Sequence, residues 1–223
     1  MRCSGQHWGS DVVTSAPWIL ATRNAGKLRE LRALFVTHAI DVIDLREAGV
    51  SEDPVAEDAV EAFDTFEENA LAKARYFSAR LPGRIVVADD SGLAVDALGG
   101  EPGVRSKRWS GRADLHGTAL DASNNALLLS RLGDRADRGA RFVCAAAWSD
   151  GVQELVVRGE VLGHIVAEAR GAHGFGYDPH VFIDELGMTL AEATVAEKER
   201  VSHRGRAFVR LLAALRARGV VTA

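Results

Sequence analysis

Short apolar segments of strand type alternate with longer segments of helical period along this chain, and this alternation limits the folds it can adopt. Such an order is typical of an α/β or α+β domain built on a mixed sheet. With 223 residues, the chain can form one such domain, or two lobes that share a sheet around a central cleft. The strand candidates are residues 18–22, 42–45, 85–88, 93–98, 141–149, 153–161, 162–166 and 181–183, and the helix candidates are residues 27–37, 60–80, 115–132, 194–200 and 207–218.

The segments between these candidates are expected to be turns and loops. Asp150-Gly151 separates two strand candidates and predicts a β-hairpin. Residues 49–60 are acidic without a clear period, which predicts an irregular surface loop. Residues 1–17 lack the basic start and apolar middle of a signal peptide. We therefore expect a disordered extension at 1–17 followed by a single domain at 18–223.

Composition argues against several classes of function. The net charge of −4 disfavours a dedicated nucleic-acid-binding protein, which is usually basic. No stretch reaches the roughly 18 apolar residues needed to span a membrane, so no membrane partner is expected. Cys3 and Cys144 are expected to be free thiols, as in proteins of a reducing compartment. The sequence predicts a cytoplasmic protein.

Two adjacent carboxylates, Asp89 and Asp90, follow the apolar run 85–88 and precede Ser91-Gly92. Side chains on a strand alternate between its faces, so the two acids are expected to have different roles. A carboxylate at a strand end is able to bind Mg²⁺ or to accept a proton from an attacking water. The alternative is a plain Ser-Gly turn in which one of the acids caps backbone amides.

Residues 22–27 combine a strand end, a turn of small residues and the start of a helix. Unpaired N–H groups at a helix N-terminus attract anions, and Lys27 adds a positive charge. The segment is expected to bind phosphate, although it lacks the glycines of the Walker pattern. A simple helix cap is the alternative. The acidic run 57–64, which includes Glu61, is either a solvated face or the source of a second metal ligand beside Asp90.

The last two motifs lie in the C-terminal third of the chain. Residues 171–179 form a glycine-rich loop in which Phe175 is placed to stack on a flat ring and Asp178 to accept hydrogen bonds from a base edge. The alternative is a structural loop with a buried Phe175. Lys198 and Arg204 are able to bind phosphate or carbonyl oxygens. Alternatively, these cations decorate a helix C-terminus. No CxxC or paired-histidine spacing indicates zinc, and no G-x-S-x-G motif indicates a serine hydrolase.

Taken together and in this order, these motifs resemble the inosine triphosphate pyrophosphatase (Ham1-like) family, whose members hydrolyse non-standard purine nucleoside triphosphates. The resemblance covers about residues 18–218. It implies a long curved mixed sheet with helices in two lobes around a cleft, Mg²⁺ dependence and a homodimer. The segments that carry it are residues 22–27, 65–74, 88–93, 98–103, 174–179 and 202–205.

The resemblance also implies roles for individual residues. Asp90 matches the general base and a metal ligand, and Glu61 matches a second metal ligand. A purine triphosphate such as ITP, dITP or XTP is the implied substrate, with pyrophosphate as a product. The implied substrate-binding residues are Thr22, Arg23, Asn24, Ala25, Gly26, Lys27, Ser91, Phe175, Gly176, Tyr177, Asp178, Lys198, His203 and Arg204.

The chain departs from the family pattern at a few positions. Arg23 stands where a small or polar residue is more common, and either contacts phosphate or faces solvent. Trp109 replaces a usual tyrosine, and the loop before Glu61 is longer than in compact members. The alternatives to a purine triphosphate pyrophosphatase are a related pyrophosphatase with another base preference and a nucleotide-binding module without catalysis.

Overall fold

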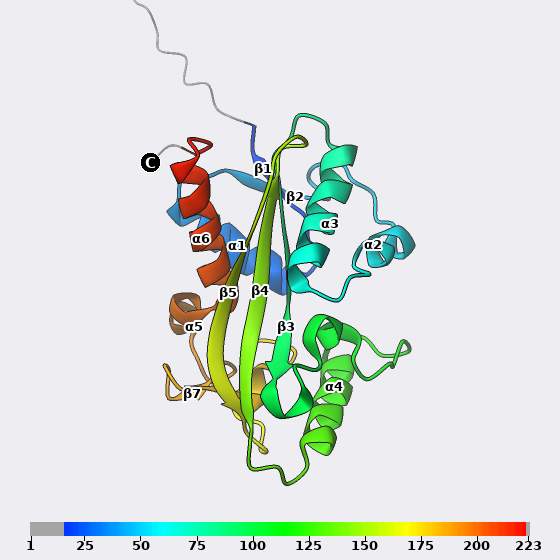
Figure 1. Cartoon of the computed structure of the whole chain (residues 1–223), viewed down its shortest axis with the longest axis vertical. Coiled ribbons are helices and arrows are strands. Elements are labelled where there is room, and N and C mark those ends of the chain that lie inside the picture. The colour runs from blue at the N-terminus through cyan, green and yellow to red at the C-terminus, as the bar shows by residue number, and fades with distance from the viewer. Residues whose placement is uncertain (1–15, 222–223) are drawn as a thin grey trace, which may run out of the picture.

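The computed structural model describes residues 16–221, which form a seven-stranded mixed sheet flanked by helices (Figure 1). The sheet order is β2-β1-β3-β4-β5-β6-β7. Strand β1 is parallel to β2 and β3, and all other neighbours are antiparallel, which confirms the predicted mixed sheet. The strands are β1 (Trp18–Leu20), β2 (Val42–Asp44), β3 (Val86–Val95), β4 (Gly139–Ser149), β5 (Glu154–Ile165), β6 (Val181–Ile183) and β7 (Met188–Thr189).

Strands β3, β4 and β5 run through the length of the molecule and are shared by two groups of elements that we call the upper and lower lobes (Figure 1). The upper lobe contains α1 (Ala25–Thr37), α2 (Pro54–Val60), α3 (Phe66–Arg80) and α6 (His203–Ala217). The lower lobe contains β6, β7, the 3₁₀ segments η1 (Asp96–Leu98), η2 (Gly103–Arg108) and η3 (Asp178–His180), and the helices α4 (Gly117–Leu132) and α5 (Val195–Val201).

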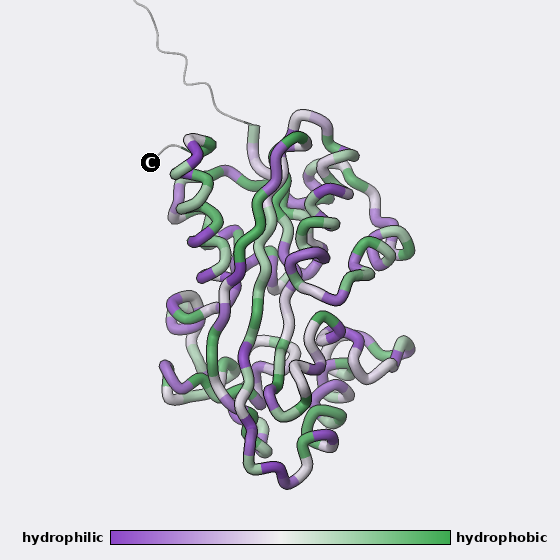
Figure 2. The backbone as a smooth tube through the Cα atoms, in the orientation of Figure 1, coloured by the Kyte–Doolittle hydropathy of each residue, from purple (hydrophilic) through white to green (hydrophobic). Residues whose placement is uncertain are grey.

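Three hydrophobic clusters form the core. In the upper lobe, α1 and α6 pack on one face of the sheet and α3 packs on the other. The helices alternate between hydrophobic and hydrophilic colour in Figure 2, as helices that bury one face do. Strand β3 contributes to all three clusters. Val87 belongs to the cluster with α1 and α6, and Val86 and Ala88 belong to the cluster with α3. Leu93 and Val95 belong to the third cluster, in the lower lobe.

The predicted turn at Ser91-Gly92 is wrong, because β3 continues through it. Ser91 pairs with Cys144 and Gly92 with Val143 in the ladder to β4. The glycine is explained by close packing: a Cβ at position 92 would lie 2.3 Å from Ser106 Oγ and 2.5 Å from the Gly103 carbonyl oxygen. Gly92 therefore lets η2 approach the strand, and Asp89 and Asp90 lie inside a strand instead of at its end.

The predicted irregular loop at 49–60 is also wrong in part, since it contains helix α2. Asp53 caps this helix by accepting a hydrogen bond from the Ala56 N–H, and Pro54 occupies its first turn. The expected helix 60–80 begins only at Phe66, because the Thr65 side chain caps it there. An acidic helix with no buried residue lacks the apolar period on which the prediction depended.

Other predicted elements differ mainly in their ends. The hairpin at Asp150-Gly151 is confirmed, but the candidates 153–161 and 162–166 form one strand, β5. Helix α6 begins at His203 instead of 207, because Ser202 caps it by accepting from the Gly205 N–H. The two-residue strand β7 was not expected.

Two expectations concern the chain as a whole. Within residues 16–221, no helix combines the length and the apolar character required to cross a membrane. The extension predicted at residues 1–17 lies outside the described residues, apart from Ala16 and Pro17.

Candidate active site

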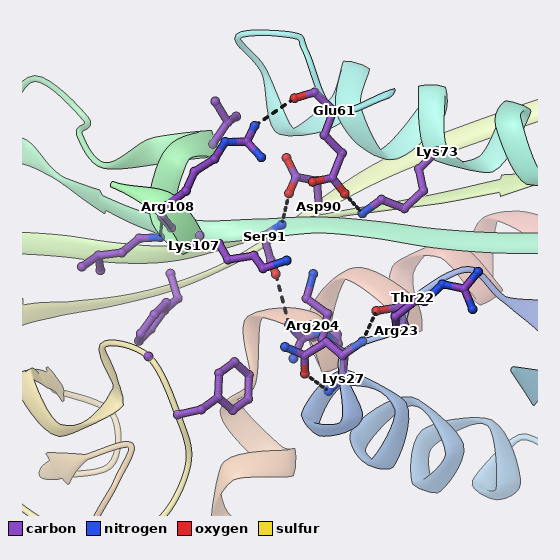
Figure 3. Close-up of a pocket in the computed structure, with 18 of the residues that line it drawn as sticks. Thr22, Arg23, Lys27, Glu61, Lys73, Asp90, Ser91, Lys107, Arg108 and Arg204 are labelled. Atoms are coloured by element: carbon purple, nitrogen blue, oxygen red, sulfur yellow. Dashed lines mark hydrogen bonds and ion pairs between the residues drawn. The ribbon is translucent and has the colours of Figure 1, made fainter. Parts of the chain in front are cut away.

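A cavity of about 380 Å³ opens between the two lobes, beside the middle of β3 (Figure 3). Its wall brings together almost every residue that the sequence singled out. Ala25 and Gly26 are the two predicted substrate-binding residues that do not line it. The predicted residues that line it are Thr22, Arg23, Asn24, Lys27, Glu61, Asp90, Ser91, Phe175, Gly176, Tyr177, Asp178, Lys198, His203 and Arg204.

The carboxylates of Asp89 and Asp90 lie on opposite faces of β3. Asp90 faces α3, where its Oδ2 accepts a hydrogen bond of 3.0 Å from Asn69 Nδ2. Burial raises the pKa of Asp90 to about 6, against the charges of Lys27 and Lys73, which lower it. A carboxylate with this pKa is mostly ionised near neutral pH and is still basic enough to accept a proton.

Glu61 and Lys73 complete the acidic side of the cavity. Glu61 ends α2, and its carboxylate forms an ion pair with Lys73 of α3. Figure 3 shows both side chains converging on Asp90. Lys73 Nζ also donates a hydrogen bond of 2.9 Å to the backbone oxygen of Asp89. Burial opposes ionisation of Glu61, but the charge and hydrogen bond of Lys73, together with the charge of Lys27, outweigh it and lower the pKa of this carboxyl.

Asp89 is fully buried on the other face of β3, among cations. Its Oδ2 lies 3.0 Å from Lys27 Nζ and 3.2 Å from Arg204 Nε. Burial alone would raise the pKa of Asp89, but the charges of Lys27 and Arg204 reverse the effect and hold the pKa well below its usual range. One carboxylate therefore fixes two cations that come from different helices.

The predicted phosphate-binding turn forms the N-terminus of α1. Asn24 caps the helix, with its Oδ1 accepting a hydrogen bond of 3.0 Å from the Lys27 N–H. Thr22 Oγ1 accepts a hydrogen bond of 3.3 Å from the Asn24 N–H. Arg23 faces away from these groups: its Nη2 donates to Glu57 at 2.7 Å and to the Ser51 carbonyl at 3.0 Å. Thr22, Asn24 and Lys27 thus lie at the cavity, while the Arg23 guanidinium is bonded to the segment 51–57.

The glycine-rich loop closes the cavity from the lower lobe. Phe175 is 38% exposed, so the alternative of a buried Phe175 is wrong. Its ring packs on Gly26, where a Cβ would lie 2.8 Å from Phe175 Cε1. Asp178 Oδ2 accepts hydrogen bonds from the Phe175 N–H at 3.1 Å and from Lys198 Nζ at 2.6 Å. The Asp178 carboxylate, predicted to bind a base edge, therefore orders its own loop.

Lys198, His203 and Arg204 lie at α5 and at the start of α6, so the alternative of a helix C-terminus decorated with cations is wrong for His203 and Arg204. Lys198 Nζ lies 5.3 Å from the centre of the Phe175 ring. Arg204 Nη2 donates to Ser91 Oγ at 3.1 Å. His203 is stacked on Phe142 with ring centres 5.1 Å apart, and burial lowers its pKa well below the usual value, which keeps it neutral.

Several residues that line the cavity or contact its wall were missed by sequence reasoning. Asn69 and Lys73 stand one helical turn apart on α3, beside the apolar stripe, and two polar residues at that spacing were the available signal. Asp121 was missed because only tertiary structure shows that its Oδ2 accepts a hydrogen bond of 2.9 Å from the Gly176 N–H. The missed residues on the cavity wall include Glu30, Lys73, Lys107, Arg108, Asp121 and Asn124.

The fold and the cavity define a mixed α/β protein with a cleft that has an acidic side and a cationic side. A family model described as the Ham1 family matches residues 18–214, and the chain belongs to this family. This confirms the resemblance drawn from the motifs.

Relatives and solved structures agree with this assignment. A dITP/XTP pyrophosphatase of Burkholderia pseudomallei is 48% identical over 200 residues, which are 88% of this chain and 92% of the relative. A dITP/XTP pyrophosphatase of Nocardia farcinica is 50% identical over 208 residues, 92% of this chain and 97% of the relative. The structure of the Staphylococcus aureus Ham1 protein superimposes on this chain with a TM-score of 0.77 at 35% sequence identity. The match covers 91% of this chain and all of the Staphylococcus aureus chain.

Proposed function

We propose that this protein hydrolyses non-standard purine nucleoside triphosphates, such as ITP, dITP and XTP, to the nucleoside monophosphate and pyrophosphate. Two relatives that match along nearly their whole length are named dITP/XTP pyrophosphatases, which supports the substrate class. The observation that carries the proposal is the position of Asp90, a buried carboxylate of raised pKa on the wall of the cavity that Lys27, in the first turn of α1, also lines.

The proposed reaction is the attack of water on the α-phosphorus. Asp90 accepts a proton from this water, a bond forms between the water oxygen and phosphorus, and the bond from phosphorus to the bridging oxygen breaks. Pyrophosphate leaves with the electron pair of that bond. Lys27 and the positive end of the α1 dipole stabilise the negative charge, and such placed electrostatics are usually the largest contribution to catalysis.

The acidic side of the cavity fits a magnesium ion. Mg²⁺ prefers oxygen ligands and is usually bound by one or two carboxylates together with substrate phosphates and waters. Among residues 16–221 no group of three or more His, Cys, Asp or Glu side chains is arranged to hold a metal, but Asp90 and Glu61 supply two carboxylates beside the cavity. In the proposal, Asp90 and Glu61 hold the ion, which would neutralise the charge of the triphosphate.

Base selection is assigned to the lower lobe. Phe175 is exposed enough to stack on a purine, and Lys198 lies beside its ring. A hydrogen-bond donor there would favour the 6-oxo group of inosine and xanthine over the 6-amino group of adenine. Guanine also has a 6-oxo group, so its rejection requires a feature of the site that penalises its 2-amino group. A site built to pair one base leaves its polar groups unpaired against another, and this discriminates strongly.

The test is a panel of ITP, XTP, dITP, GTP and ATP, assayed for pyrophosphate with and without Mg²⁺. We expect Mg²⁺-dependent release of pyrophosphate from the first three and much slower release from GTP and ATP. Equal rates on all five would overturn the base selectivity, and a preference for another base would favour the related pyrophosphatase. Tight binding of ITP without pyrophosphate would indicate a binding module.

Asp90→Asn tests the assignment of the base. We expect its rate to fall by about 10²–10⁴ if Asp90 accepts the proton. Near-native turnover of this variant with Mg²⁺ present would show that another group is the base. The expected homodimer and cytoplasmic location stay predictions, the first to be tested by the mass of the protein in solution.

A further inference from the structure

Helix α2 is held in place by polar contacts. None of its residues is buried, so hydrophobic packing does little to fix its position. Residues of α2 nevertheless line the cavity, and Glu61, whose carboxylate is proposed to bind Mg²⁺, is the C-cap of this helix. Whatever holds α2 therefore also sets the position of Glu61.

The strongest of these contacts joins Glu57 of α2 to Arg23. Arg23 Nε lies 3.0 Å from Glu57 Oε2, and Nη2 lies 2.7 Å from Oε1, so the guanidinium binds the carboxylate through two parallel hydrogen bonds. The two side chains are only 22% and 19% exposed. Such a bidentate and partly buried pair fixes orientation as well as distance.

The other bonds of Arg23 go to the loop that leads into α2. Nη2 donates to the Ser51 carbonyl at 3.0 Å, and Nη1 and Nη2 lie 3.5 and 3.4 Å from the Val50 carbonyl oxygen. All three nitrogens of the side chain thus have acceptors within the protein. The guanidinium thus connects the turn before α1 to the segment 50–57, and its shortest bonds go to the protein and not into the cavity.

We propose that Arg23 and Glu57 form a latch that positions α2, and with it the Glu61 carboxylate, at the metal-binding side of the cavity. Arg23 is then a positioning residue and not a phosphate ligand. The inference rests on the proposed function for its kinetic test, but the position of α2 is measurable without any substrate. Loss of partners that orient a metal ligand typically weakens metal binding by about 10–100-fold.

The test compares Arg23→Gln and Glu57→Gln with the double variant. A latch predicts that both single variants raise the Mg²⁺ concentration for half-maximal rate by about 10-fold or more. At saturating Mg²⁺, kcat and the KM for ITP should return close to the wild-type values. The double variant should be no worse than either single variant, because both remove one interaction. If Arg23→Gln alone raises the KM for ITP and Glu57→Gln does not, Arg23 is a phosphate ligand and the latch is wrong.

A structural readout separates this inference from the proposed function. Amide hydrogen exchange of residues 55–61 should be faster in both single variants than in the wild type, without substrate or metal. Glu52→Gln is the matched control, since Glu52 lies 4.0 Å from Arg23 but is 71% exposed, and it should change neither exchange nor the Mg²⁺ requirement. Unchanged exchange in Arg23→Gln would overturn the latch. A wild-type protein that releases no pyrophosphate would overturn only the proposed function.

Discussion

Asp89 and Asp90 are neighbours in β3, yet the pKa of the Asp89 carboxyl is lowered and the pKa of the Asp90 carboxyl is raised. Asp89 is surrounded by cations on the α1 and α6 face, whereas Asp90 faces α3 with an amide donor and a nearby carboxylate. The alternation of side chains along a strand separates them. One of the pair is thereby fixed as an ion, while burial leaves the other able to exchange a proton near neutral pH.

The raised pKa of Asp90 predicts that Asp90→Asn stabilises the metal-free protein. Between its ordinary pKa of 3.8 and about 6, folded Asp90 keeps a proton that the unfolded chain releases, so stability falls as pH rises through this window. Above pH 6 the variant should gain up to about 3 kcal/mol in the free energy of unfolding, and near pH 4 it should gain nothing. Urea denaturation in EDTA from pH 4 to 8 measures this, and a difference that does not vary with pH would contradict it.

Asp89→Asn should have the opposite effect. It leaves Lys27 and Arg204 without their shared carboxylate, and breaking a buried ion pair in this way costs about 3–5 kcal/mol. Because the folded pKa is depressed, the contribution of Asp89 is present above the ordinary value of 3.8 and is lost as pH falls below it. Asp114→Asn, in an exposed pair with Arg112, is the control and should stay within about 0.5 kcal/mol. If Asp89→Asn and Asp114→Asn had equal urea midpoints at pH 7, the prediction would be refuted.

The contact between Gly26 and Phe175 predicts that the effect of Gly26→Ala on stability depends on the side chain at position 175. Gly26 lies inside α1 with no left-handed backbone, so alanine there should stabilise the helix by up to about 1 kcal/mol if space allows. In the wild type the new Cβ meets the Phe175 ring, and the gain should vanish or reverse. In a Phe175→Ala background, Gly26→Ala should raise the melting temperature. The same shift in both backgrounds would show that the ring does not occupy this space.

Gly159 of β5 is predicted to set how closely α6 approaches the sheet. A Cβ at this position would lie 2.4 Å from the Ala207 nitrogen and 2.5 Å from the His203 carbonyl oxygen, and both are backbone atoms of α6. Gly159→Ala should cost about 1–3 kcal/mol in stability and lower kcat/KM for ITP, because the helix that carries Arg204 must move. Leu162→Ala, 64% exposed on the same strand, is the control for denaturation and kinetics. Wild-type stability of Gly159→Ala would contradict the prediction.

The sequence was informative where local pattern and motif order decide the outcome. The mixed sheet, the hairpin at Asp150-Gly151 and the gathering of nearly all the motif residues at one cavity were within its reach. It failed where the deciding partner is distant in the chain. Ser91-Gly92 has the composition of a turn, and only the approach of η2 explains the glycine inside a strand. Helix α2 was missed because its position depends on contacts such as that of Glu57 with Arg23, and it has no buried face.

Strand β3 supplies residues to all three hydrophobic clusters, and β4 runs beside it for its whole length. The two lobes therefore have no boundary at which one could melt while the other stays folded. Heating should produce a single cooperative transition, in which the cleft loses its shape together with the rest of the molecule. The part of the site that β3 carries, Asp90 and Ser91, is therefore lost only when the whole fold is lost.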